Sequence, residues 1–73
     1  MTPEMIKTFI ETGLENSRAV VVGNDGVHFE ATVTCPQFAG KTMLAQHRMV
    51  YETLGDKLKQ EIHALSLKTL VVE

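Results

Sequence analysis

The chain has 73 residues, a formal net charge of −2 and a single cysteine, and 44% of its residues are hydrophobic. This length predicts one small domain over residues 1–73, and a single cysteine excludes an internal disulfide or a cysteine-based zinc finger. No apolar run approaches the roughly 18 residues of a membrane span, and the negative charge argues against a dedicated, charge-driven nucleic-acid binder.

The first predicted element is a helix that starts at the N-terminus. Thr2 provides a side-chain cap, Pro3 suits the first helical position, and Glu4 faces the positive end of the helix dipole. The apolar residues that follow at helical spacing are Met5, Ile6, Phe9, Ile10 and Leu14. Gly13 weakens the last turn, and Asn16 can supply a left-handed exit. We therefore expect a helix that packs this stripe into the core.

A β-hairpin is predicted next. Residues 19–22 form a short β-branched strand, and Gly23-Asn24-Asp25-Gly26 is typical of a turn with positive φ angles. The strand after it, residues 27–35, alternates regularly. Its inward positions are Val27, Phe29, Ala31, Val33 and Cys35, and its outward positions are His28, Glu30, Thr32 and Thr34. We therefore expect Cys35 to be buried and His28 to be exposed, with the strand ending at Pro36.

The last part of the chain predicts two helices and a strand. The first of these helices covers about residues 41–54, and its inner stripe comprises Met43, Leu44, His47, Val50, Tyr51 and Leu54. Gly55 ends it, Asp56 can cap a third helix to about His63, and residues 65–72 form the final strand. A helical crossover favours parallel addition of that strand to the hairpin. The expected fold is an α+β, αββααβ two-layer sandwich, with a three-stranded mixed sheet and the helices on one face.

Four segments in this order resemble the BolA family, most closely its short IbaG-like branch. They are Gly26-Val27-His28-Phe29, Phe38-Ala39-Gly40-Lys41, Gln46-His47-Arg48-Met49-Val50-Tyr51 and Glu61-Ile62-His63-Ala64-Leu65. The resemblance covers nearly the whole chain. It implies a KH-like fold of type II topology, which agrees with the element order derived from the residues.

The KH-like fold raises nucleic-acid binding as an alternative function. A KH module clamps phosphates with a Gly-x-x-Gly loop between two helices, whereas the only such tetrad here, residues 23–26, lies in the predicted hairpin and carries an acid. Some BolA relatives are described as transcription regulators, so DNA remains the alternative partner. The cations that would contact it are Lys41, Arg48, Lys57 and Lys59, and a solvated helix face is the simpler explanation of these charges.

Each histidine also has an ordinary structural explanation. His47 lies on an apolar helix stripe, His28 lies on the wet face of a strand, and His63 at a helix end is favoured by the helix dipole. The resemblance implies more for two of them. In BolA proteins, a histidine at the position of His63 and a histidine or cysteine in the loop after the first strand, here His28, are implicated as metal ligands for a [2Fe–2S] cluster.

The number of ligands then makes a partner necessary. A [2Fe–2S] cluster needs four ligands, and two imidazoles can replace two of the usual thiolates. The resemblance supplies the rest: a monothiol glutaredoxin gives its cysteine and bound glutathione gives a second thiolate, so no cluster is expected in the isolated chain. Cluster binding should be pH-sensitive, because each imidazole must lose its proton to ligate.

No catalytic constellation is present in the sequence. Cys35 has the core-facing parity of its strand, which is typical of an inert apolar thiol. There is no serine-centred elbow, P-loop, paired-carboxylate or Rossmann motif. Together with this absence, the BolA resemblance implies a non-enzymatic, cytoplasmic adaptor in iron–sulfur handling with a role in stress response. We expect no membrane contact, and a monomer or weak homodimer when the chain is alone.

Overall fold

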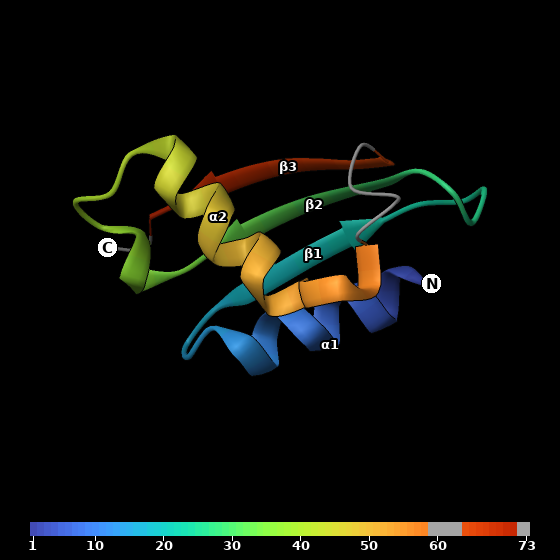
Figure 1. Cartoon of the computed structure of the whole chain (residues 1–73), viewed down its shortest axis with the longest axis horizontal. Coiled ribbons are helices and arrows are strands. Elements are labelled where there is room, and N and C mark those ends of the chain that lie inside the picture. Colours follow the sequence, from blue (N-terminus) through green and yellow to red (C-terminus); the bar gives the residue numbers. More distant parts are fainter. Residues whose placement is uncertain (59–63, 72–73) are drawn as a thin grey trace.

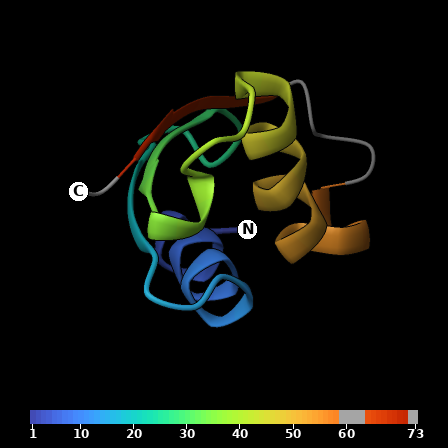
Figure 2. The same cartoon turned by 90° about the vertical axis from the view of Figure 1, so that its left-hand side faces the viewer.

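The computed structural model describes residues 1–58 and 64–71 of the chain. Its elements, in order, are α1 (Pro3–Gly13), β1 (Arg18–Val22), β2 (Phe29–Thr34), the 3₁₀ helix η1 (Pro36–Phe38), α2 (Met43–Leu54), the 3₁₀ helix η2 (Gly55–Leu58) and β3 (Leu65–Leu70). Figures 1 and 2 show α1 and α2 on the same face of the sheet. The predicted α+β, two-layer architecture is confirmed.

The sheet has the strand order β1-β2-β3, with β1 antiparallel and β3 parallel to β2. Parallel strands need a crossover over one face of the sheet, and α2 lies on that crossover (Figure 1). The predicted mixed sheet with parallel addition of the last strand is therefore confirmed. Of the predicted third helix, from Asp56 to about His63, the structure shows η2 over its first residues, and residues 59–63 lie outside the described residues.

The predicted alternation holds over β2 and fails just before it. Phe29, Ala31, Val33 and Cys35 are buried, and the side chain of His28 is 70% exposed. These exposures confirm which side chains of the strand were predicted to face inward and outward. Val27 was expected inside but is 55% exposed. The reason is that β2 begins at Phe29, so Val27 belongs to the loop and not to the pleated strand.

Helix α1 follows its sequence signals closely. The Thr2 hydroxyl accepts a hydrogen bond from the Met5 N–H, at 3.2 Å between the heavy atoms. Asn16 adopts the expected left-handed conformation, with φ of 63°. Met5, assigned to the inner stripe, is 45% exposed and lies at the edge of that stripe. Gly13 has an additional role, because a Cβ there would lie 2.6 Å from the Thr53 methyl group, so this glycine lets α1 and α2 approach.

The buried face of α2 differs from the predicted one at its N-terminal half. The helix was expected from residue 41 but starts at Met43, with Thr42 as its N-cap. Met43 is 70% exposed and Leu44 is 61% exposed, so both were wrongly placed in the core. The buried residues of α2 are Gln46, Val50 and Leu54. Half-buried positions on this helix include His47 and Tyr51.

Gln46 takes the inward position because its amide bonds to groups beneath the helix. Its Nε2 donates to the carbonyl oxygens of Phe38 (3.2 Å) and Lys41 (3.0 Å), and its Oε1 accepts from the Thr69 hydroxyl. A buried polar group is tolerated when it is fully hydrogen-bonded. The Gln46 side chain thus connects the segment before α2 to β3. Met43 and Leu44 lie in the first turn of α2, before its first buried residue, and this is why they reach solvent.

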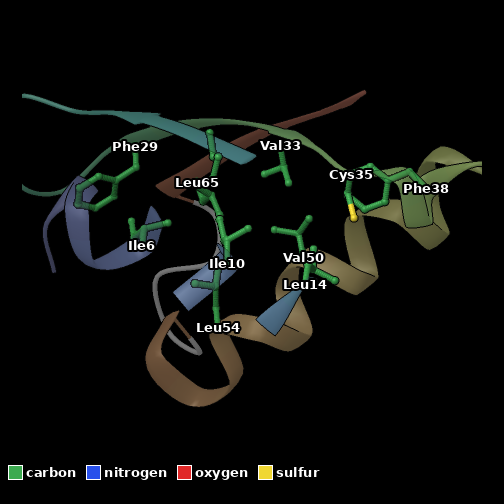
Figure 3. Packing of buried hydrophobic residues seen from close by; sticks show 12 residues of the cluster. Ile6, Ile10, Leu14, Phe29, Val33, Cys35, Phe38, Val50, Leu54 and Leu65 are labelled. Carbon is green, nitrogen blue, oxygen red and sulfur yellow. The ribbon is translucent and has the colours of Figure 1, made fainter. Parts of the chain in front are cut away.

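The core lies between the sheet and the two helices (Figure 3). β2 contributes Phe29 and Val33, and the helices cover them with branched aliphatic side chains. The residues with essentially no exposed surface include Ile6, Ile10, Val33, Cys35, Phe38 and Val50. None of the helices that the structure describes is long and apolar enough to cross a membrane.

An ion pair joins α1 to the backbone of β1. The Glu11 carboxylate accepts from the Lys7 ammonium (2.6 Å) and from the Ala19 N–H (2.9 Å), and Lys7 also donates to the Ala19 carbonyl oxygen (3.1 Å). The Ala19 N–H, and then the Lys7 ammonium, lower the pKa of the Glu11 carboxyl from its ordinary value of 4.5. The ionised carboxylate therefore stabilises the folded state.

We expect Gln46→Leu to lower the free energy of unfolding by about 2 kcal/mol or more. The leucine would leave the Phe38 and Lys41 carbonyls and the Thr69 hydroxyl without this partner, and an unsatisfied buried polar group costs roughly 1–3 kcal/mol. Urea unfolding followed by circular dichroism measures the change. Gln37→Leu is the matched control, because exposed Gln37 also bonds to a carbonyl oxygen but water can replace that bond. Equal losses in both variants would contradict this role of Gln46.

The Glu11 carboxylate predicts an acid-dependent loss of stability. Because folding lowers its pKa, the contribution is present above the ordinary glutamate value of 4.5 and is lost as pH falls through the lower folded value. Wild-type stability should therefore decline more steeply than that of Glu11→Gln as the pH is reduced below about 5. Urea titrations at several pH values measure the slopes, with Glu52→Gln on the exposed surface of α2 as control. Parallel profiles for wild type and Glu11→Gln would refute the assignment.

Candidate functional site

The most organised surface feature around a histidine is the loop of residues 23–28 that joins β1 to β2. Asp25 holds this loop by accepting two backbone hydrogen bonds on Oδ1, from the N–H of Val27 (2.9 Å) and of His28 (2.8 Å). Such side-chain-to-backbone bonds are typical of aspartate in turns. They fix the backbone directly before β2, and so they determine the backbone position from which the His28 side chain extends.

Two glycines allow the loop to take this shape. Gly26 has a φ of 73°, in the left-handed region that favours glycine. At Gly23, a Cβ would lie 2.7 Å from the His28 carbonyl oxygen and 2.8 Å from the Phe29 ring. The chain just after β1 therefore lies close beside the start of β2, which supports the backbone that carries His28.

The imidazole of His28 is exposed but has one fixed partner. Its Nδ1 lies 3.0 Å from Asp25 Oδ2. Among the residues that the structure describes, none forms a hydrogen bond with Nε2, which lies across the ring from Nδ1. Nε2 is thus the nitrogen that is available to an incoming ligand.

The electrostatics of Asp25 follow from the same contacts. The N–H of His28 has the largest effect and lowers the pKa of the Asp25 carboxyl, and the His28 ring and the Val27 N–H lower it further. Each bond favours the ionised form, which only accepts hydrogen bonds. At neutral pH the loop therefore presents a carboxylate, and not a carboxylic acid, to the imidazole.

The sheet topology brings the chain next to His63 to the same place. Phe29 at the start of β2 pairs with Leu65 at the start of β3. The residues just before these partners, His28 and Ala64, line one groove of about 710 Å³ together with Glu4, Glu30 and Ser66. His63 itself lies outside the described residues. The two strand starts therefore lie at one end of the sheet, as parallel addition of the last strand requires.

The other predicted or considered donors are placed differently. Cys35 is buried, and its thiol lies 3.8 Å from the Glu15 carbonyl oxygen. His47 is half-buried on α2. Within residues 1–58 and 64–71, no three His, Cys, Asp or Glu side chains gather in a way that could hold a metal ion. The described part of the chain therefore contributes single donors and not a complete metal site.

The candidate nucleic-acid contacts are dispersed and partly engaged. Lys41, Arg48 and Lys57 are exposed, and Lys59 lies outside the described residues. The Lys57 ammonium lies 4.6 Å from the centre of the Phe9 ring, so it already makes a cation–π contact. The Gly23–Gly26 tetrad joins β1 and β2 and does not lie between two helices, as the sequence predicted.

The position of Asp25 is the feature of the candidate site that the sequence did not reveal. The sequence indicates a turn residue and the acid of the Gly-x-x-Gly tetrad, yet Asp25 contacts both the backbone and the ring of His28. An aspartate three residues before a histidine, followed by glycine, is a pattern that could have indicated this contact.

Comparison with known proteins agrees with this fold. A solved BolA homologue from Coxiella burnetii is 54% identical, with a TM-score of 0.81, and the match covers 94% of this chain and 88% of that one. The protein named "DNA-binding transcriptional regulator BolA" is 38% identical in Vibrio cholerae, over 97% of this chain, and 34% identical in Escherichia coli, over 89% of it. The chain spans 63% and 62% of the lengths of these two relatives.

The family model that matches is described as BolA-like protein, and the match extends over residues 1–73. The fold and the relatives agree with the resemblance inferred from the four sequence segments, while the narrower assignment to the IbaG-like branch stays a prediction. The chain belongs to the BolA-like family.

Proposed function

We propose that this protein is a non-enzymatic, cytoplasmic adaptor in iron–sulfur handling that pairs with a monothiol glutaredoxin. In the complex, His28 and His63 would ligate a shared [2Fe–2S] cluster, and the glutaredoxin cysteine and glutathione would supply the other ligands. The observation that carries the proposal is the parallel pairing of β2 with β3, which starts both strands at one end of the sheet.

That pairing supports a common site for the two histidines. His28 and Ala64 line the same groove, and adjacent strands lie about 4.8 Å apart. Ala64 directly follows His63 in the sequence. One partner surface can therefore reach His28 and the described residue next to His63.

The set of available donors also favours a cluster shared with a partner, and not a metal site formed by this chain alone. His28 is exposed, and its Nε2 bonds to none of the described residues, so it suits a ligand to an incoming iron. The described residues form no three-donor group, and a [2Fe–2S] cluster needs four ligands. Two imidazoles from this chain require two thiolates from elsewhere, which a glutaredoxin with bound glutathione would provide.

We expect His28→Ala and His63→Ala each to change the spectrum of the complex with iron-loaded monothiol glutaredoxin. Each substitution removes one proposed iron ligand and leaves the apolar core intact, so the variants should fold normally, with the smaller spectral effect for His28→Ala. Visible absorption and circular dichroism follow the cluster, and far-ultraviolet circular dichroism follows the fold.

His47→Ala is the matched control for these two variants. Its half-buried position on α2 predicts an effect on stability or docking and not on the cluster's absorption bands. A folded His47→Ala variant that loses the bands, beside a His63→Ala variant that retains them, would refute the ligand assignment.

A nucleic-acid-binding transcriptional regulator is the second candidate, because two relatives carry that name. If duplex DNA is the partner, binding should weaken with salt by a slope of about −0.9 per phosphate contact, and Lys41→Gln/Arg48→Gln should reduce the slope by about 2. Fluorescence anisotropy at several salt concentrations measures this without glutaredoxin. We expect no such binding at physiological salt, and a steep slope that the double variant reduces would favour DNA.

A further inference from the structure

Asp25 uses its two carboxylate oxygens for two different tasks. Oδ1 accepts both backbone hydrogen bonds, from Val27 and from His28. Oδ2 is left to face Nδ1 of the His28 ring at 3.0 Å. Since Oδ1 alone holds the turn, the contact with the ring is an addition that the backbone conformation does not require.

The contact determines which nitrogen of a neutral imidazole carries the proton. A carboxylate can only accept hydrogen bonds, and Oδ2 of Asp25 lies 3.0 Å from Nδ1 of the ring. Nδ1 must therefore be the N–H that donates to Oδ2. The lone pair of the neutral ring then lies on Nε2, the nitrogen without a partner among the described residues.

Building on the proposed function, in which His28 binds iron, we propose that Asp25 is a positioning residue for that ligand. It holds His28 in the Nδ1–H tautomer and presents Nε2 to the incoming iron. Metal-ligating histidines commonly donate their other ring N–H to a carboxylate, which fixes the ring and increases its basicity. Here the carboxylate is itself fixed, because Oδ1 is bonded to the backbone on which the ring is mounted.

The other acids at the groove do not share this role. Glu4 and Glu30 line the same groove, but among the described residues Asp25 is the one whose carboxylate lies against the imidazole. A general negative charge near His28 could come from any of the three. A fixed tautomer depends on the one oxygen that faces Nδ1, and this difference makes the inference testable.

Asp25→Asn separates the two tasks of the side chain. Its amide oxygen can take the place of Oδ1 and retain the bonds from the Val27 and His28 N–H groups. Its NH₂ group then takes the place of Oδ2 and faces Nδ1 as a donor, so Nδ1 has to accept. The proton of the neutral ring moves to Nε2, which removes the lone pair from the nitrogen that would bind iron.

The test is the tautomer of His28 in the isolated chain, measured by long-range ¹H–¹⁵N correlation on ¹⁵N-histidine-labelled protein at alkaline pH, where neutral imidazole predominates. We expect Nδ1–H in the wild type and Nε2–H in Asp25→Asn. Glu30→Gln removes the same charge from the groove and should retain the wild-type tautomer. A wild type that is mainly Nε2–H, or the same tautomer in wild type and Asp25→Asn, would overturn the inference.

A second measurement separates this inference from the proposed function. In the glutaredoxin heterocomplex, Asp25→Asn should weaken cluster retention about 10- to 100-fold, the usual effect of losing such an outer carboxylate. If His28→Ala changes the cluster spectrum and Asp25→Asn does not change retention, the positioning role of Asp25 is wrong and the proposed function stands. If neither variant has an effect, His28 is not a ligand, and both the positioning role of Asp25 and the proposed ligand role of His28 are wrong.

Discussion

The parallel pairing of β3 with β2 is the constraint on which the rest of the structure depends. In the register Phe29 with Leu65, both strands begin at one end of the sheet, and the chain has to cross one face to make this arrangement. The crossover places α2 beside α1 over the core (Figure 1). It also brings two places that are far apart in sequence, the loop of residues 23–28 and Ala64 directly before β3, to a common groove.

The loop at that groove shows how a small domain can hold an exposed side chain in a defined orientation. His28 has little packing around it, so its orientation depends on local hydrogen bonds. Asp25 supplies three of these contacts, and Gly23 and Gly26 give the backbone the close approach and the positive φ that it needs. The local geometry therefore comes from six consecutive residues and not from the core.

Much of the fold was predictable because its signals are local or periodic. The Thr2 cap, the left-handed Asn16 and the alternation from Phe29 to Cys35 each depend on neighbours in sequence. The face of α2 was predicted less well, because the burial of Gln46 depends on Phe38, Lys41 and Thr69, and the sequence does not reveal that these groups converge. In the candidate site, the exposure of His28 was predictable from the inward–outward alternation of its strand. Its contact with Asp25 was not, because that contact depends on the loop geometry.

The ion pair between Lys7 and Glu11 also affects how molecules of this protein meet one another. The strand order leaves β1 at an edge of the sheet, and edge strands can pair with strands of other chains and so initiate aggregation. The Ala19 N–H and carbonyl oxygen point away from β2, because they bond to Glu11 and Lys7. A foreign strand would have to displace both charged side chains before it could pair at Ala19, near the start of this edge. The contact that fastens α1 to the sheet thereby also protects this part of β1 from intermolecular pairing.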